Sequence, residues 1–151
     1  MIHRTGTASL AGMSGAELPV AEFAFPGPLR DQLVTAILAG DKTTTSGLLA
    51  GYERDGEPLP EPGQRQVVID SAGAPVAVIE TTAVQVLRLG DVGLAHALGE
   101  GEGFASVAEW RAGHEQFWHS AEVRDEMGDP QFTVDDDTLV VAQAFRLAQI
   151  L

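Results

Sequence analysis

A single lysine stands beside a row of hydroxyl side chains. Lys42 is followed directly by Thr43, Thr44, Thr45 and Ser46. An amine that partial burial keeps neutral can take a proton from a hydroxyl, and this turns the hydroxyl oxygen into a nucleophile. The arrangement therefore predicts acyl-transfer chemistry that uses neither cysteine nor histidine. The alternative is that Lys42 only stabilises the negative end of a preceding helix.

Carboxylates in two other segments could complete such a site. Glu80 interrupts an apolar stretch over residues 76–86, where a buried carboxylate would need a cation and a solvated one would not. Glu100 and Glu102 alternate with glycines over residues 99–103, which is typical of an exposed acidic loop. Two carboxylates can also hold a hard cation such as Mg²⁺. Because the spacing singles out no metal, we expect neither a resident metal nor another cofactor.

An aromatic segment near residue 110 is the third candidate for ligand contact. Helical spacing places Trp110, His114 and Phe117 on one apolar face, which is typical of core residues, and we expect Phe117 in the core. Arg111 and Trp118 point elsewhere. Planar aromatic and guanidinium groups of this kind stack on nucleobases.

The elements that position these groups follow from periodicity and turn signals. Apolar residues at helical spacing predict a helix over 29–39 that ends at Gly40, followed by a turn over 41–46. Asp91 is the expected N-cap of a later helix, and Ser106 with Glu109 forms a capping box. The other expected elements are helical segments over 48–52, 91–98 and 106–123, and strands over 67–69, 75–87 and 139–147. This content predicts an α+β domain with a mixed or antiparallel sheet, compatible with a small barrel.

Composition excludes several classes of protein. The chain has 151 residues, a formal net charge of −13 and no cysteine, so disulfides and thiol chemistry are ruled out. The negative charge disfavours a nucleic-acid coat and binding to anionic membranes. Residues 1–18 lack the apolar core of a signal peptide, and the longest apolar run, 76–79, is far too short to span a bilayer. We therefore expect a soluble cytoplasmic protein with a loose N-terminal arm. The sequence does not indicate an oligomeric state.

Several segments, taken in order, resemble the ASCH domain family, and in particular its larger bacterial branch. Residues 40–45 look like that family's G-x-K-x-x-T turn, and the other matching segments are 78–82, 100–103, 110–114 and 145–147. The resemblance covers about residues 22–148, which implies an N-terminal arm over 1–21 and an ASCH domain over 22–151. It also implies a PUA-like fold, a small mixed β-barrel with flanking helices and a cleft beside the K-x-x-T turn.

The resemblance implies an activity. Some ASCH proteins are amidohydrolases that remove the acyl group of N4-acetylcytidine with a lysine, a threonine and a glutamate. Matching residues carry these roles to Lys42, Thr45 and Glu100, the last of which ends the stretch 96–100 (HALGE). In this picture Lys42 activates Thr45, Thr45 attacks the acyl carbon, and Glu100 moves a proton or fixes the amide.

The substrate contacts and partners are also expectations from this resemblance. The residues expected to touch substrate are Thr44, Ser46, Tyr52, Glu80, Glu102, Trp110, Arg111 and His114. Phe104 and Gln143 stand where the family often has acids. The alternatives are an RNA- or nucleotide-binding module and a metal-dependent ribonuclease acting on single-stranded RNA. Because the charge of −13 repels long RNA, a small nucleoside ranks before a short single-stranded RNA as the partner.

Overall fold

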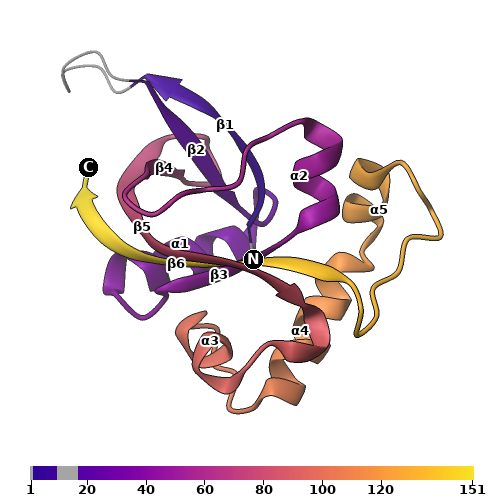
Figure 1. Ribbon diagram of the computed structural model, residues 1–151. Helices are drawn as coiled ribbons and strands as arrows, with labels where there is room; N and C mark the ends of the chain where they lie inside the picture. Colours follow the sequence, from indigo (N-terminus) through magenta and orange to yellow (C-terminus); the bar gives the residue numbers. More distant parts are fainter. Residues whose placement is uncertain (1, 10–16) are drawn as a thin grey trace.

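One mixed sheet of six strands forms the centre of the molecule (Figure 1). The computed structural model describes residues 2–9 and 17–151. The strands follow the order β1-β2-β4-β5-β6-β3, and every pair is antiparallel except β2 with β4. Their bounds are β1 Ile2–Ser9, β2 Glu17–Phe23, β3 Thr44–Leu48, β4 Arg65–Ile69, β5 Pro75–Arg88 and β6 Leu139–Ile150. The predicted α+β class with a mixed sheet is confirmed.

In the described residues, five α-helices and one 3-10 turn surround this sheet. They are α1 Pro28–Ala39, α2 Leu49–Asp55, the 3-10 turn η1 Leu89–Asp91, α3 Leu94–Gly99, α4 Val107–Trp118 and α5 Ala121–Met127. Helices α3 and α4 lie together beside the β3–β6 side of the sheet, and α5 continues from α4 (Figure 1). Among the described residues, no helix combines the length and apolar character needed to cross a bilayer.

The sheet is not closed into a barrel, and this corrects the barrel expectation. In the described part of the chain the ladder of paired strands ends at β1 on one side and at β3 on the other. A barrel requires the two outer strands to pair with each other, with strand tilt and stagger that match. Strand β3 has five residues and pairs only with β6. The sheet is therefore open.

The N-terminal segment differs from the loose arm expected over residues 1–21. Strand β2 pairs with β1 on one side and with β4 on the other, so the expected boundary at residue 22 falls inside a strand. Val20 and Ala21 are buried in the core. Small and polar residues around this strand hide its periodicity in the sequence. Residues 1 and 10–16 of the expected arm lie outside the described residues.

Three boundaries differ from the sequence expectation for local reasons. The turn expected over 41–46 is already strand from Thr44, because β-branched residues pair well with β6. Asp91 ends η1, and Gly93 precedes α3 in its place. The helix expected over 106–123 is interrupted after Trp118, because the Ser120 hydroxyl accepts from the Val123 amide and starts α5. The Ser106 cap is confirmed: its hydroxyl accepts from the amide three residues on.

The aromatic helix α4 is more deeply buried than expected. Phe117 lies in the core as predicted, and Trp110 and His114 are wholly buried. Trp118, expected to meet a flat ligand, is only 2% exposed and packs in the same core. The apolar face of α4 is therefore wider than the three-residue stripe in the sequence indicates.

Candidate functional site

Backbone turns at two glycines bring Lys42 against the acidic loop. Helix α1 ends at Gly40, whose φ of 84° is left-handed, and the chain folds back so that the Lys42 amide donates to Ala36 O. Gly101 has a φ of 66°, and a Cβ there would lie 2.6 Å from Asp41 O. Only glycine allows this approach. The loop after α3 therefore lies directly on the turn that carries Lys42.

Lys42 and Glu100 form a wholly buried ion pair. The Lys42 Nζ lies 3.2 Å from Glu100 Oε1, and both side chains are 0% exposed. The same ammonium donates to Glu100 O at 3.2 Å and to Thr44 O at 3.0 Å. An ammonium has three protons, so its donors are all engaged. Lys42 is thus held as a cation in the resting structure.

The second oxygen of Glu100 is equally well surrounded. Oε2 accepts from Ser46 Oγ at 3.1 Å and from Trp110 Nε1, and His114 Nε2 lies 2.8 Å away. Burial alone would raise the pKa of Glu100, but the charge of Lys42, together with the other close contacts of the carboxylate, outweighs it and holds the pKa well below its usual range. The carboxylate is therefore ionised at neutral pH.

Two histidines complete the cluster around this carboxylate. His96 Nε2 lies 2.7 Å from Ser46 Oγ, and burial lowers the pKa of His96, so its ring is neutral at pH 7. His114 lies on α4, stacked on Trp110 with ring centroids 4.2 Å apart. Its Nδ1 is 2.9 Å from Trp110 O, and since a carbonyl only accepts, this nitrogen carries a proton.

Thr45, the predicted nucleophile, lies on the other face of the strand from Ser46. Adjacent strand residues point to opposite faces, and Ser46 faces Glu100. Thr45 is opposite Gln143 in the β3–β6 ladder, next to a buried set of polar groups in which Gln143 Nε2 donates to Gln66 Oε1 and to Thr81 Oγ1. Thr45 is 0% exposed. Its Oγ1 has no hydrogen-bond partner among the described residues, Lys42 included.

The structure gathers most of the predicted site residues and, besides Thr45, separates three. Thr44, Ser46, Trp110 and His114 lie beside the Lys42–Glu100 pair, with Thr44 Oγ1 donating to His96 O. Glu80 instead pairs with Arg146 at 3.0 Å and Arg65 at 3.2 Å on a partly exposed surface. These two hydrogen bonds lower the pKa of Glu80.

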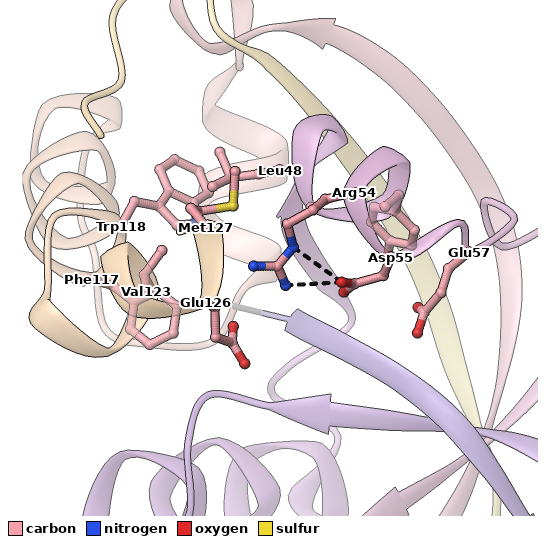
Figure 2. A pocket seen from close by; sticks show the side chains of 11 residues that line it. Leu48, Arg54, Asp55, Glu57, Phe117, Trp118, Val123, Glu126 and Met127 are labelled. Atoms are coloured by element: carbon pink, nitrogen blue, oxygen red, sulfur yellow. Dashed lines mark hydrogen bonds and ion pairs between the residues drawn. The ribbon is translucent and has the colours of Figure 1, made fainter. Parts of the chain in front are cut away.

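Arg111 and Tyr52 also lie elsewhere. Arg111 binds Glu115 at 2.6 Å and Asp136 at 2.7 Å, so its guanidinium is engaged on the surface. Tyr52 lines a separate small cavity between α2, α4 and α5, shown in Figure 2, whose walls include Trp118 and Met127. Burial, together with the nearby Glu57, raises the pKa of the Tyr52 phenol above its usual value. None of the residues lining that cavity belongs to the cluster around Glu100.

Glu102 adds a donor that could help to hold a cation. One ligand atom each from Glu100, Glu102 and His114 can be chosen so that the three lie within 4.8 Å of one another. Glu102 Oε2 is buried without a hydrogen-bond partner among the described residues. The sequence expectation names Glu100 as the catalytic carboxylate and Glu102 and His114 as substrate contacts, and it notes that the two carboxylates could also hold a hard cation such as Mg²⁺.

Sequence reasoning missed two parts of the site. His96 was noticed only as part of the stretch that ends at Glu100, although its position four residues before Glu100 places both on one side of α3. The polar set around Gln143 joins residues as far as 77 positions apart in the chain. No local pattern in the sequence signals such a set.

Comparison with known proteins places this geometry in context. Residues 22–149 match the family model described as ASCH domain. A crystal structure of an ASCH domain from Lactobacillus crispatus JV V101 is 28% identical with a TM-score of 0.69, covering 85% of this chain and 79% of that one. A crystal structure of an Enterococcus faecalis V583 protein assigned to DUF984 is 28% identical with a TM-score of 0.65, covering 77% of this chain and 66% of that one. No curated protein shows significant similarity to the chain.

Proposed function

The chain belongs to the ASCH domain family, and on this premise we propose that it hydrolyses the amide of a small acylated nucleoside such as N4-acetylcytidine. The observation that carries the proposal is a buried Lys42–Glu100 ion pair three residues from a buried threonine hydroxyl without a partner. Lys42, Thr45 and Glu100 are the residues to which the family resemblance assigns this chemistry.

The unpartnered hydroxyl of Thr45 supports a chemical role. A buried polar group without a hydrogen bond costs about 1–3 kcal/mol of folding free energy. Valine has nearly the same shape and would avoid this cost. A hydroxyl kept in such a position is typical of a group retained for function rather than for stability.

The reaction can be written with every proton assigned. Lys42 passes one proton to Glu100 Oε1 across 3.2 Å, and its neutral Nζ turns from Thr44 O toward Thr45 Oγ1. Nζ takes the hydroxyl proton while the Thr45 oxygen attacks the acyl carbon. The C–N bond then breaks, and Lys42 gives that proton to the departing nitrogen of the nucleobase.

Water completes the cycle. It attacks the acyl-threonine ester and passes a proton to Lys42, which returns it to the Thr45 oxygen as the ester bond breaks. Glu100 gives its proton back to Lys42, and the buried charged pair is restored. The net reaction converts an amide and water into an amine and a carboxylic acid.

Charge supports a small neutral substrate over long RNA. The net charge of −13 repels a polyanion, whereas it has little effect on the approach of an uncharged nucleoside. Arg111, the cation that could have met a phosphate near α4, is already bound to Glu115 and Asp136.

The test is a deacylation assay with matched variants. Purified protein is incubated with N4-acetylcytidine, and cytidine is followed by chromatography. We expect Thr45→Val to lose deacylation while its circular dichroism stays native. Thr43→Val makes the same chemical change at an exposed position of the same turn and keeps the activity.

Three results would overturn the proposal. The first is wild-type protein without deacylase activity, and the second is undiminished activity in Thr45→Val. The third is binding of the nucleoside without turnover, which would identify a binding module. A parallel incubation with single-stranded RNA shows whether the same preparation is a ribonuclease.

A further inference from the structure

We propose that Glu100, Glu102 and His114 form a binding site for a first-row divalent cation. One ligand atom from each residue lies within 4.8 Å of the other two. His114 Nε2 and Glu100 Oε2 are 2.8 Å apart. Bonds of about 2.0–2.2 Å to a single ion place two neighbouring ligand atoms about 3 Å apart. This pair of atoms is therefore already at the spacing of two ligands of one ion.

The state of His114 is the independent observation that points to a cation. Its ring is 0% exposed, and its Nε2 has no hydrogen-bond partner among the described residues. Nδ1 carries the proton that Trp110 O requires, which leaves Nε2 as the ring nitrogen that a metal ion can bind. The contact with Glu100 Oε2 is close but outside hydrogen-bonding geometry. A divalent cation between them would bind both this nitrogen and the carboxylate oxygen.

Glu102 supplies the third donor and shows the same lack of a partner. Its Oε2 is buried and unpaired in the part of the chain that the structure describes. Glu100 and Glu102 bring two negative charges, of which Lys42 compensates one. A divalent cation would more than offset the remaining negative charge and would give both orphaned atoms a partner.

The donor types select the kind of cation. One imidazole and two carboxylates suit Zn²⁺, Mn²⁺ or Co²⁺, whereas Ca²⁺ and Mg²⁺ prefer oxygen ligands alone. Three protein ligands also leave a position open for water or a substrate atom. The proposed deacylation uses no step through this ion, so either proposal can be wrong without affecting the other.

A surface hollow lies close to the proposed site. Glu102, Phe104 and Gly113 line it together with residues of α1 and α4. The Phe104 ring lies 6.0 Å from the His114 ring, between centroids, so the hollow reaches the neighbourhood of His114. The half-buried Glu102 side chain is the donor nearest to solvent.

The two tryptophans of the chain provide a built-in probe. The ring centroids of Trp110 and Trp118 lie 4.2 Å and 5.2 Å from that of His114. We expect Co²⁺ added to chelator-treated, full-length protein to quench tryptophan fluorescence in a saturable, one-to-one titration. Excess chelator should restore the signal, and visible absorption of bound Co²⁺ should follow the same curve.

Matched variants decide whether these residues are the ligands. Glu102→Gln keeps the size of a half-exposed side chain and should weaken Co²⁺ binding about tenfold or more. Glu122→Gln removes the same charge from an exposed position on α5 and should bind like the wild type. The proposal is wrong if wild-type quenching does not saturate, or if the two variants bind Co²⁺ equally. Loss of deacylase activity alone has no bearing on it.

Discussion

The ammonium of Lys42 lies 3.2 Å from the carboxylate of Glu100, although 58 positions separate the two residues in the chain. Both side chains are fully buried, and the donors of Lys42 and the acceptors of Glu100 are engaged by neighbouring groups. The pair therefore ties the turn after α1 to the loop after α3. Stability and the proposed chemistry depend on the same contact.

Removing one partner of this pair should be costly. Lys42→Met keeps the apolar stem but leaves Glu100 as a buried charge without its counterion. Breaking a buried pair in this way costs about 3–5 kcal/mol. We expect a loss of this size in the free energy of unfolding, measured by urea denaturation followed by circular dichroism.

An exposed ion pair serves as the control for that measurement. Arg65 pairs with Glu80 where the arginine side chain is 49% exposed. Arg65→Met should cost at most about 1 kcal/mol, because water already screens this pair. Equal losses in the two variants would contradict the assigned difference between buried and exposed charges.

The loop after α3 should tolerate no side chain at its first glycine. Gly101→Ala places a Cβ 2.6 Å from Asp41 O and forces an alanine into a left-handed backbone. Gly73 has a similar φ of 81°, but a Cβ added there would have no atom within 4 Å. Gly73→Ala therefore measures only the cost of placing an alanine in a left-handed backbone, about 1–2 kcal/mol. We expect Gly101→Ala to lose clearly more thermal stability than Gly73→Ala. Equal melting temperatures would show that the close approach to Asp41 is absent.

The unpartnered hydroxyl of Thr45 predicts an unusual gain in stability. Thr45→Val removes a buried polar group without breaking a hydrogen bond, so the free energy of unfolding should rise by about 1 kcal/mol. Thr81→Val is the matched control, since its hydroxyl accepts from Gln143 and its loss should destabilise the fold. Chemical denaturation of both variants checks the sign. A destabilised Thr45→Val would mean that the hydroxyl has a partner in solution.

Acid should destabilise the protein in two steps. Burial lowers the pKa of His96 in the folded state, and its unfolded value is about 6.5. Below about pH 6.5 the unfolded chain binds more protons, so stability falls as pH falls. The depressed pKa of Glu100 adds a second loss that begins below its unfolded value of about 4.3. Above pH 6.5 the free energy of unfolding contains the full contributions of both His96 and Glu100.

A variant separates the two steps. His96→Gln should flatten the fall that begins near pH 6.5 and leave the steeper fall below about pH 4.3. Urea midpoints measured from pH 3 to 8 give the comparison. An unchanged slope between pH 5 and 6.5 in His96→Gln would show that another group causes the first step.

Local patterns predicted the elements with strong periodicity. The helix over 29–39 and the long strand over 75–87 are found within a residue of their expected bounds. The helix expected over 106–123 was overextended, because nothing in the apolar stripe marks the interruption that Ser120 caps. Strand β2 escaped prediction, because apolar residues stand on both of its faces and leave no clear alternation.

The sequence by itself determined the class of the domain and its family, and through the family resemblance it assigned Lys42 and Glu100 to one site. Turn residues, caps and ordered motifs are local, and they are readable without the fold. Only the tertiary structure decided that Lys42 pairs with Glu100 and has all its hydrogen-bond donors engaged. It also decided that Thr45 lies opposite Gln143. Finally, it placed unpaired atoms of His114 and Glu102 beside Glu100. Burial, strand face and long-range hydrogen bonds depend on how distant segments pack, and no spacing along the chain records them.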